Sequence, residues 1–118
     1  MSESDPRVLM RQMLEAAQKA HSYIEGYSKE DFLADPRTQE AVALNLMVIG
    51  EVAGKLSRRH PDLMGLYDHI PWRRMQGMRN RIAHGYFDLD MNVVWETASE
   101  WVPDLLRSLS KPDRTGNV

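Results

Sequence analysis

The 118-residue chain contains no cysteine, no long apolar run and no large excess of charge of either sign. Without cysteine, disulfide bonds, thiolate catalysis and cysteine-ligated zinc sites are excluded. No apolar run approaches the roughly 20 residues that span a bilayer, and residues 1–6 lack the basic and apolar regions of a signal peptide. We therefore expect a soluble protein with no membrane partner, and the cytoplasm as its default location.

A net charge of −2 at pH 7 argues against a general nucleic-acid coat protein, because nonspecific binding scales with the cations brought to the phosphate backbone. A local phosphate site remains permitted. Hydrophobic residues make up 42% of the chain and charged residues 27%, which is an ordinary globular balance. Length and composition together predict a single domain over residues 1–118 with one core.

Apolar residues at helical spacing, together with capping signals, predict four main helices: 6–25, 36–59, 71–84, and a last one from Asp90 or Asn92 to Leu109. Shorter helical turns are expected within 28–33 and 61–69. No segment alternates apolar and polar residues for long enough to predict a strand. The fold class expected is all-α, a small up-and-down helical bundle of about four main helices, with a frayed tail from Ser110.

Glycine and proline give the predicted helices their ends. Gly26 is placed to stop the first helix, and Gly85 to end the third in the left-handed conformation that glycine adopts cheaply. Pro103 is expected to kink the last helix. The helix over 36–59 carries Gly50 and Gly54 beside its apolar stripe, so another helix backbone is predicted to approach closely there.

Chemistry-capable side chains concentrate in residues 70–88, which have no carboxylate between Asp68 and Asp88. The segment carries an amide, an imidazole, a phenol and four arginines: Asn80, His84, Tyr86, Arg73, Arg74, Arg79 and Arg81. We take Arg73, Arg74 and Arg81 as candidate ligands for phosphate or RNA. On a helix, Gly77, Asn80 or Arg81, and His84 share a face because they are spaced by three or four residues.

A histidine beside arginines and an amide suits the transesterification of an RNA phosphodiester. Arginine can hold the phosphate and stabilise its charge, and histidine can move the protons. No metal site is indicated, because the four histidines lack the spacing of metal ligands, and no cofactor is expected. The favourable interaction of Arg and His with a helix C-terminus explains the same residues without catalysis, and Tyr86 with Phe87 can be core aromatics. Glu51 can likewise form a surface pair with Lys55.

The series Arg79-Asn-Arg-Ile-Ala-His84-Gly-Tyr86 resembles the motif of the HepT-like branch of the HEPN superfamily, which comprises toxin ribonucleases of toxin–antitoxin pairs. The resemblance covers nearly the whole chain. Three further features match in order and spacing, namely Asp5 with Arg7, the segment Ile49-Gly-Glu-Val52, and Val94-Trp95.

The resemblance implies a homodimer whose two motifs face each other across a cleft for RNA, with metal-independent endoribonuclease activity. Arg79 and His84 would be the catalytic pair, supported by Asn80 and Glu51, although helical spacing alone favours Arg81 as the neighbour of His84. Tyr86 matches a tyrosine that an MntA-like minimal nucleotidyltransferase antitoxin modifies with AMP, and assembly with that antitoxin is implied. The alternative is a noncatalytic helical module that binds a nucleotide or the nucleotidyltransferase.

Overall fold

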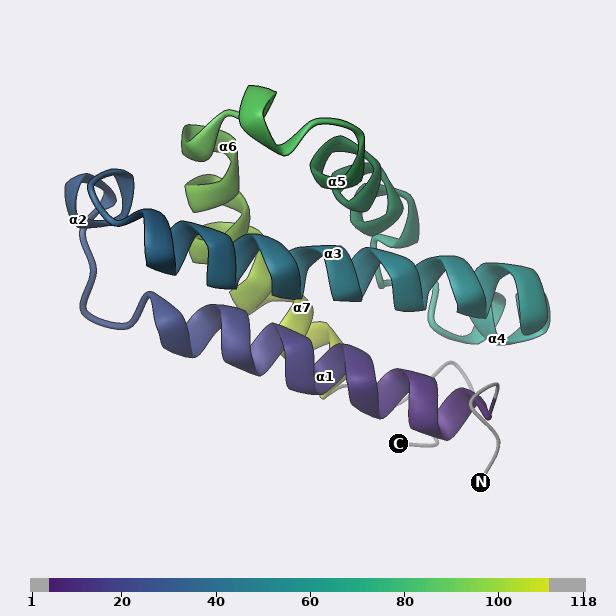
Figure 1. Ribbon diagram of the computed structural model, residues 1–118. Coiled ribbons are helices and arrows are strands. Elements are labelled where there is room, and N and C mark those ends of the chain that lie inside the picture. Colours follow the sequence, from purple (N-terminus) through teal and green to yellow (C-terminus); the bar gives the residue numbers. More distant parts are fainter. Residues whose placement is uncertain (1–4, 111–118) are drawn as a thin grey trace.

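The computed structural model describes residues 5–110, and every regular element in that range is helical (Figure 1). In chain order these are α1 (Pro6–Tyr23), α2 (Lys29–Leu33), α3 (Pro36–Arg59), α4 (Pro61–Leu66), α5 (Trp72–His84), a 3₁₀ turn (Tyr86–Asp88), α6 (Met91–Glu96), a π-helical segment (Thr97–Trp101) and α7 (Val102–Leu109). The predicted all-α class is confirmed. The tail expected to fray lies, beyond Ser110, outside the described residues.

The first three helices begin where side-chain caps hold their free backbone N–H groups. Asp5 accepts a hydrogen bond from the backbone N–H of Arg7 at 2.9 Å, and Ser28 forms a reciprocal capping box with Asp31. Asp35 accepts from the backbone N–H of Thr38 at 3.2 Å. Gly26 has φ +77°, so the chain turns after α1 through the left-handed conformation that glycine permits. These local signals explain why the predicted boundaries of α1, α2 and α3 agree with the structure to within about two residues.

Helix α3 lies at the centre of the bundle and runs antiparallel to α1, which covers one side of it (Figure 1). The predicted apolar stripe of α3 is buried, and its fully buried neighbours include Leu9 and Met13 of α1 and Val94 and Val102 of the C-terminal helices. Tyr23, the last residue of α1, is 39% exposed. The core therefore forms between α3, α1 and the C-terminal helices.

Helix α5 crosses α3 on the side away from α1, and in Figure 1 it is seen nearly end-on while α3 runs across the view. The crossing is close. A Cβ atom added to Gly50 of α3 would lie 2.2 Å from the Cβ of Arg79 and 2.4 Å from the backbone oxygen of Met75. The close backbone approach predicted at Gly50 and Gly54 is confirmed at Gly50, where it presses α5 against α3 at Arg79. At Gly54 the nearest atoms belong to the side chains of Arg58 and Gln76.

The backbone at Gly85 and near Pro103 differs from the simple helix end and kink expected there. Gly85 has φ −171°, an extended conformation rather than the predicted left-handed one. The chain leaves α5 extended and enters a 3₁₀ turn in which the N–H of Asp88 donates to the carbonyl of Gly85. Near Pro103 the disturbance takes the form of the π-helical segment, where the N–H of Val102 donates to the carbonyl of Thr97, just before the proline that lacks a donor.

Across residues 5–110, none of the helices combines the length and the apolar character that a membrane crossing requires.

Candidate active site

Helix α5 carries most of the arginine-rich segment, and only a narrow strip of this helix is buried. Met75, Met78 and Ile82 anchor it on the core, and the indole N–H of Trp72 donates to the carbonyl of Tyr67 at 3.1 Å. The remaining positions of the helix face solvent or the grooves beside it. Because residues advance by about 100° around a helix, these positions point in several different directions.

A polar groove of about 280 Å³ lies between α3 and α5, and we call it the α3–α5 groove. Its lining residues from the two helices are Gly50, Glu51, Gly54, Lys55, Arg58, Gln76, Arg79 and Asn80. Three of the residues taken from the sequence as catalytic or supporting, Arg79, Asn80 and Glu51, therefore lie together.

Arg79 is held by contacts on both sides in this groove. Its Nε lies 3.8 Å from Oε1 of Glu51, and one of its terminal nitrogens donates to Oδ1 of Asn80 at 3.3 Å. The two charged side chains are 41% and 47% exposed, so this ion pair adds little stability. Its consequence is orientation, because the carboxylate directs the guanidinium along the groove. The predicted surface pair of Glu51 with Lys55 is replaced by this contact.

Two further cations line the same groove. Lys55 and Arg58 follow Glu51 by four and seven residues, so all three lie on one face of α3. Neither cation forms an ion pair with a described residue. A Cβ added to Gly54 would lie 3.1 Å from a terminal nitrogen of Arg58, which shows that this side chain folds back over the glycine. Sequence reasoning misses Arg58, although its spacing from Glu51 was a usable signal.

His84 stands apart from Arg79 within one chain. It is the last residue of α5, its side chain is exposed, and it makes no hydrogen bond, ion pair or ring contact with the described residues. Five residues separate it from Arg79, which places the two about 140° apart around the helix. A single chain therefore presents the imidazole on the exposed crest of α5 and the guanidinium in the α3–α5 groove.

The other three arginines of the segment do not enter the α3–α5 groove. Arg73 is exposed and has no partner among the described residues. Arg74 lies over the ring of Trp101, 4.0 Å from its centroid, and Arg81 lines the same side of α5 as Arg74. As candidate phosphate ligands, these residues would act outside the groove that holds Arg79.

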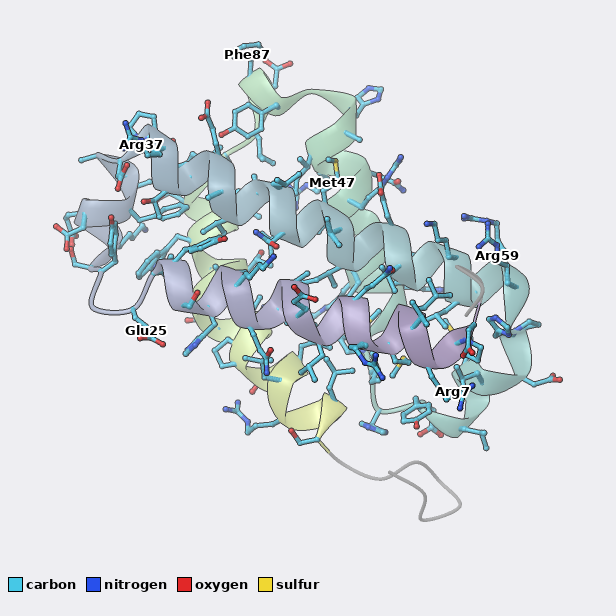
Figure 2. The ribbon with its side chains drawn as sticks, turned by 60° about the horizontal axis from the view of Figure 1, so that its bottom comes forward. Arg7, Glu25, Arg37, Met47, Arg59 and Phe87 are labelled. Carbon is cyan, nitrogen blue, oxygen red and sulfur yellow. The ribbon has the colours of Figure 1, made fainter. Side chains whose placement is uncertain are left out.

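Tyr86 and Phe87 occupy the 3₁₀ turn after α5 and differ sharply in exposure. Tyr86 is partly buried against the core, and burial, with a smaller effect from the charge of Glu40, raises the pKa of its phenol. Phe87 is fully exposed and stands clear of the helices in Figure 2, with its ring centroid 6.2 Å from that of Tyr86. The reading of both residues as core aromatics is therefore wrong for Phe87 and holds only in part for Tyr86.

Within residues 5–110, no three side chains of His, Asp or Glu come together in a way that could hold a metal ion.

Comparison with known proteins gives consistent matches over most of the chain. The profile of the family described as "Ribonuclease HepT-like" matches residues 13–111. The chain is 37% identical over 102 residues to "Probable ribonuclease HepT" of Thermococcus cleftensis, covering 83% of this chain and 90% of that protein. It is 30% identical over 111 residues to "Putative RNase MJ1216" of Methanocaldococcus jannaschii, covering 94% and 89%. No solved structure gives a significant match.

Proposed function

The chain belongs to the HepT-like ribonuclease family, and from that premise we propose that it is an RNase of the HEPN type that cleaves RNA internally. The observation that carries the proposal is the α3–α5 groove. There Arg79 is oriented by Glu51 and Asn80, beside the unpaired cations Lys55 and Arg58. Such a groove suits a phosphodiester backbone, because guanidinium groups bind phosphate oxygens through paired N–H donors.

The proposed reaction is an internal transesterification that needs no metal ion. The 2′-oxygen attacks the adjacent phosphorus, the bond to the 5′-oxygen breaks, and the strand ends in a 2′,3′-cyclic phosphate. His84 takes the 2′-hydroxyl proton or protonates the departing 5′-oxygen, since imidazole titrates near neutral pH. Arg79 stabilises the negative charge that develops on the phosphate oxygens. Asn80 and Glu51 position Arg79.

We propose that the working form is a homodimer, because one chain does not bring Arg79 and His84 together. In a pair of chains related by a two-fold axis, the exposed crest of α5 in one copy can complete the groove of the other. Exposed apolar side chains support this arrangement: Leu44 on α3 is 56% exposed and Phe87 is fully exposed.

The role proposed for the RNase is that of the toxin in a toxin–antitoxin pair, silenced by an MntA-like nucleotidyltransferase. The phenolic oxygen of Tyr86 would attack the α-phosphate of ATP, with loss of its proton and departure of pyrophosphate, to leave a tyrosyl-AMP. Tyr86 lies two residues after His84, so the new phosphate would add an anion beside the arginines of α5 and compete with RNA.

Substitution of His84 tests the RNase proposal. His84→Ala should lower RNA cleavage by about 10²- to 10⁴-fold, the usual contribution of a general acid or base, and leave the helical circular-dichroism spectrum unchanged. The matched control is His21→Ala, which removes an exposed histidine from α1. Retained cleavage by His84→Ala would refute the assigned role of His84. RNA binding by the unchanged chain, with no cleavage of a broad RNA panel, would favour the noncatalytic module instead.

The proposed modification has a separate test. Incubation of the chain with the nucleotidyltransferase and ATP should add AMP, seen by mass spectrometry, and Tyr86→Phe should abolish the addition. Tyr23→Phe is the control, because it removes the hydroxyl of a solvent-exposed tyrosine on α1. Mapping of the added mass to any residue other than Tyr86 would contradict the proposal.

A further inference from the structure

A second groove lies on the other side of α5, between this helix and the segment formed by α6 and the π-helical turn. Its volume is about 620 Å³, and we call it the α5–α6 groove. Arg74, Gly77 and Arg81 line it from α5, and Glu96 and Trp101 line it from the opposite side. The positions on α5 differ by roughly 150° from those that line the α3–α5 groove, so the two grooves flank the helix.

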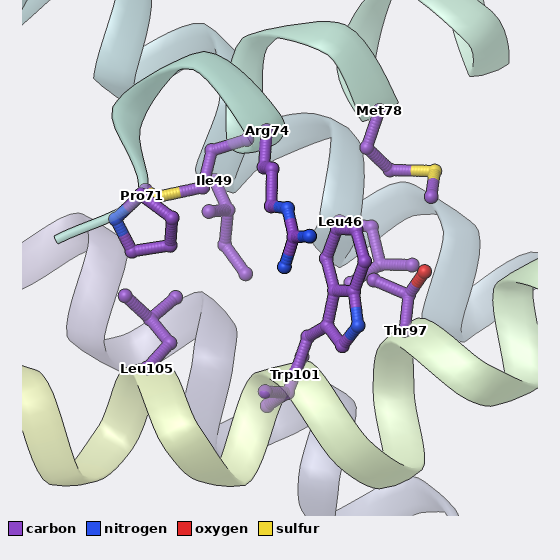
Figure 3. A pocket seen from close by; sticks show the side chains of 10 residues that line it. Leu46, Ile49, Pro71, Arg74, Met78, Thr97, Trp101 and Leu105 are labelled. Atoms are coloured by element: carbon purple, nitrogen blue, oxygen red, sulfur yellow. The ribbon is translucent and has the colours of Figure 1, made fainter.

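Arg74 lies against the aromatic ring of this groove. Its guanidinium carbon lies 4.0 Å from the centroid of the Trp101 ring, and Figure 3, a close view of a neighbouring pocket that both residues also line, shows the two side chains next to each other. The guanidinium makes this cation–π contact, and no hydrogen bond or ion pair to a described residue uses its N–H donors. The cation is therefore held in place with its donors still available.

The π-helical segment sets the position of Trp101. It spans Thr97–Trp101, and its wider turn changes the direction in which the side chains at its end point. The hydroxyl of Thr97, the first residue of this segment, donates to the carbonyl of Val93 at 2.7 Å. The result is an aromatic ring turned toward α5 with a cation on its face.

Gly77 keeps the centre of the groove open. A Cβ atom built on Gly77 would meet nothing within 4 Å. The glycine lies between Arg74 and Arg81, which are seven residues and hence about 10 Å apart along the helix axis. Two cations with an open floor and an aromatic ring between helices form the combination that single-stranded nucleic acid uses, phosphate on arginine and base on a flat ring or guanidinium.

We propose that the α5–α6 groove binds a single-stranded segment of the RNA substrate next to the cleaved bond. The inference rests on the proposed RNase function. Arg74 and Arg81 take phosphates, and a base stacks on the layer formed by Arg74 and Trp101. Glu96 accepts a hydrogen bond from a base amino group, and its charge disfavours an acidic peptide in the same place. His84 lies on the crest between the two grooves, so a strand that occupies both passes the imidazole.

The test measures RNA binding in the His84→Ala background, where the proposed reaction is slowed by about 10²- to 10⁴-fold. The probe is a single-stranded RNA of about ten nucleotides with mixed sequence, and binding is followed by fluorescence anisotropy at constant salt. Gly77→Leu fills the groove from an open position with a good helix former, and Arg74→Ala removes the stacked cation. Each should weaken binding by about 5- to 20-fold, consistent with the loss of one stacked base.

Controls separate this inference from the function beneath it. Arg37→Ala removes an exposed arginine from the first turn of α3 and should leave RNA binding as it is, and a dinucleotide probe should show a smaller loss than the longer RNA in both groove variants. Cleavage by the unchanged chain, together with full RNA affinity in Gly77→Leu and Arg74→Ala, would overturn the groove assignment alone. If those variants lost affinity only for the nucleotidyltransferase, the groove would be a protein site. Absence of RNA binding by the unchanged chain would overturn both proposals.

Discussion

The two contacts of α3, with α1 on one side and with α5 on the other, are built from different residues. Toward the core, α3 presents aliphatic side chains such as Val42 and Leu56, which are fully buried. Toward α5 it presents Gly50 and Gly54, and the polar groups of Glu51 and Arg79 stand where the helices meet solvent. The first contact excludes water over a wide area, whereas the second brings two backbones close beneath a polar groove.

This difference shows how one helix serves both the fold and the site. Aliphatic contacts contribute most of the stability, since burial of apolar surface is the main favourable term in folding. The glycine contact contributes less burial but places Arg79 directly against α3, within reach of Glu51. The α3–α5 contact is therefore the one whose disturbance should change chemistry as well as stability.

The largest expected effect distinguishes the two arginines of the motif. Arg79→Ala should lower kcat for RNA cleavage by about 10²- to 10³-fold, because it removes a group proposed to stabilise transition-state charge. Arg81→Ala should act on KM and by less than about 10-fold, since Arg81 lies on the opposite side of α5. Steady-state kinetics on one RNA substrate, with circular dichroism to verify folding, measures both.

The reverse ranking, with Arg81→Ala more harmful to kcat, would move the catalytic centre to the α5–α6 groove. Glu51→Gln provides the matched check, because it keeps the size of the side chain and removes the charge that orients Arg79. It should lower kcat by a smaller factor than Arg79→Ala.

The next effect concerns stability, and it compares two glycines that face opposite surroundings. Gly50→Ala should lower the free energy of unfolding by about 1–2 kcal/mol, because the added Cβ overlaps Arg79 and Met75 by more than the gain in helix propensity can offset. Gly77→Ala adds the same atom in open space and should raise the free energy of unfolding by up to about 1 kcal/mol. Urea unfolding of both variants measures the difference. Equal stabilities would mean that α5 shifts freely on α3.

The same contrast explains which features were predictable from sequence. The first residues of α1 and α3 follow from local groups, the Asp-Pro pairs that cap them, so the positions where these helices begin needed no tertiary information. The close approach at Gly50 was also predictable, because two glycines in one long helix require a packing reason. The backbone conformation of Gly85 was not predictable, because it depends on the 3₁₀ turn that follows α5 and not on the glycine alone.

In the candidate site, too, some features were predictable from sequence and others depend on tertiary packing. Sequence spacing placed Asn80 and His84 on one helix, and the resemblance selected Arg79 over Arg81. The turn of Arg79 toward Glu51 and the position of Arg74 over Trp101 depend on how α5 crosses its neighbours, which no spacing along α5 encodes. Arg58 joins the groove for the same tertiary reason. Residue types were therefore predictable, and the groove to which each belongs was not.

The smallest expected effect concerns the pH dependence of stability, and it tests the contacts of Asp35 at the start of α3. The hydroxyl of Thr38 and the phenol of Tyr27 each donate to Asp35 at 2.6 Å, and together with the backbone N–H of Thr38 they lower the pKa of this carboxyl from 3.8 to about 2. The ionised carboxylate therefore stabilises the fold at pH above about 4, and that contribution is lost as the pH falls toward 2. Thermal unfolding measured from about pH 5 down to about pH 2 tests this contribution. The unchanged chain should lose stability over that range, and Asp35→Asn should lose less, because its amide cannot titrate. Tyr27→Phe removes one donor and raises the pKa of Asp35 in the folded chain, so the loss should be smaller and complete at a higher pH. An identical acid profile in all three chains would show that the link between α1 and α3 does not depend on the charge of Asp35, and would leave its aliphatic contacts to account for the stability of that pair.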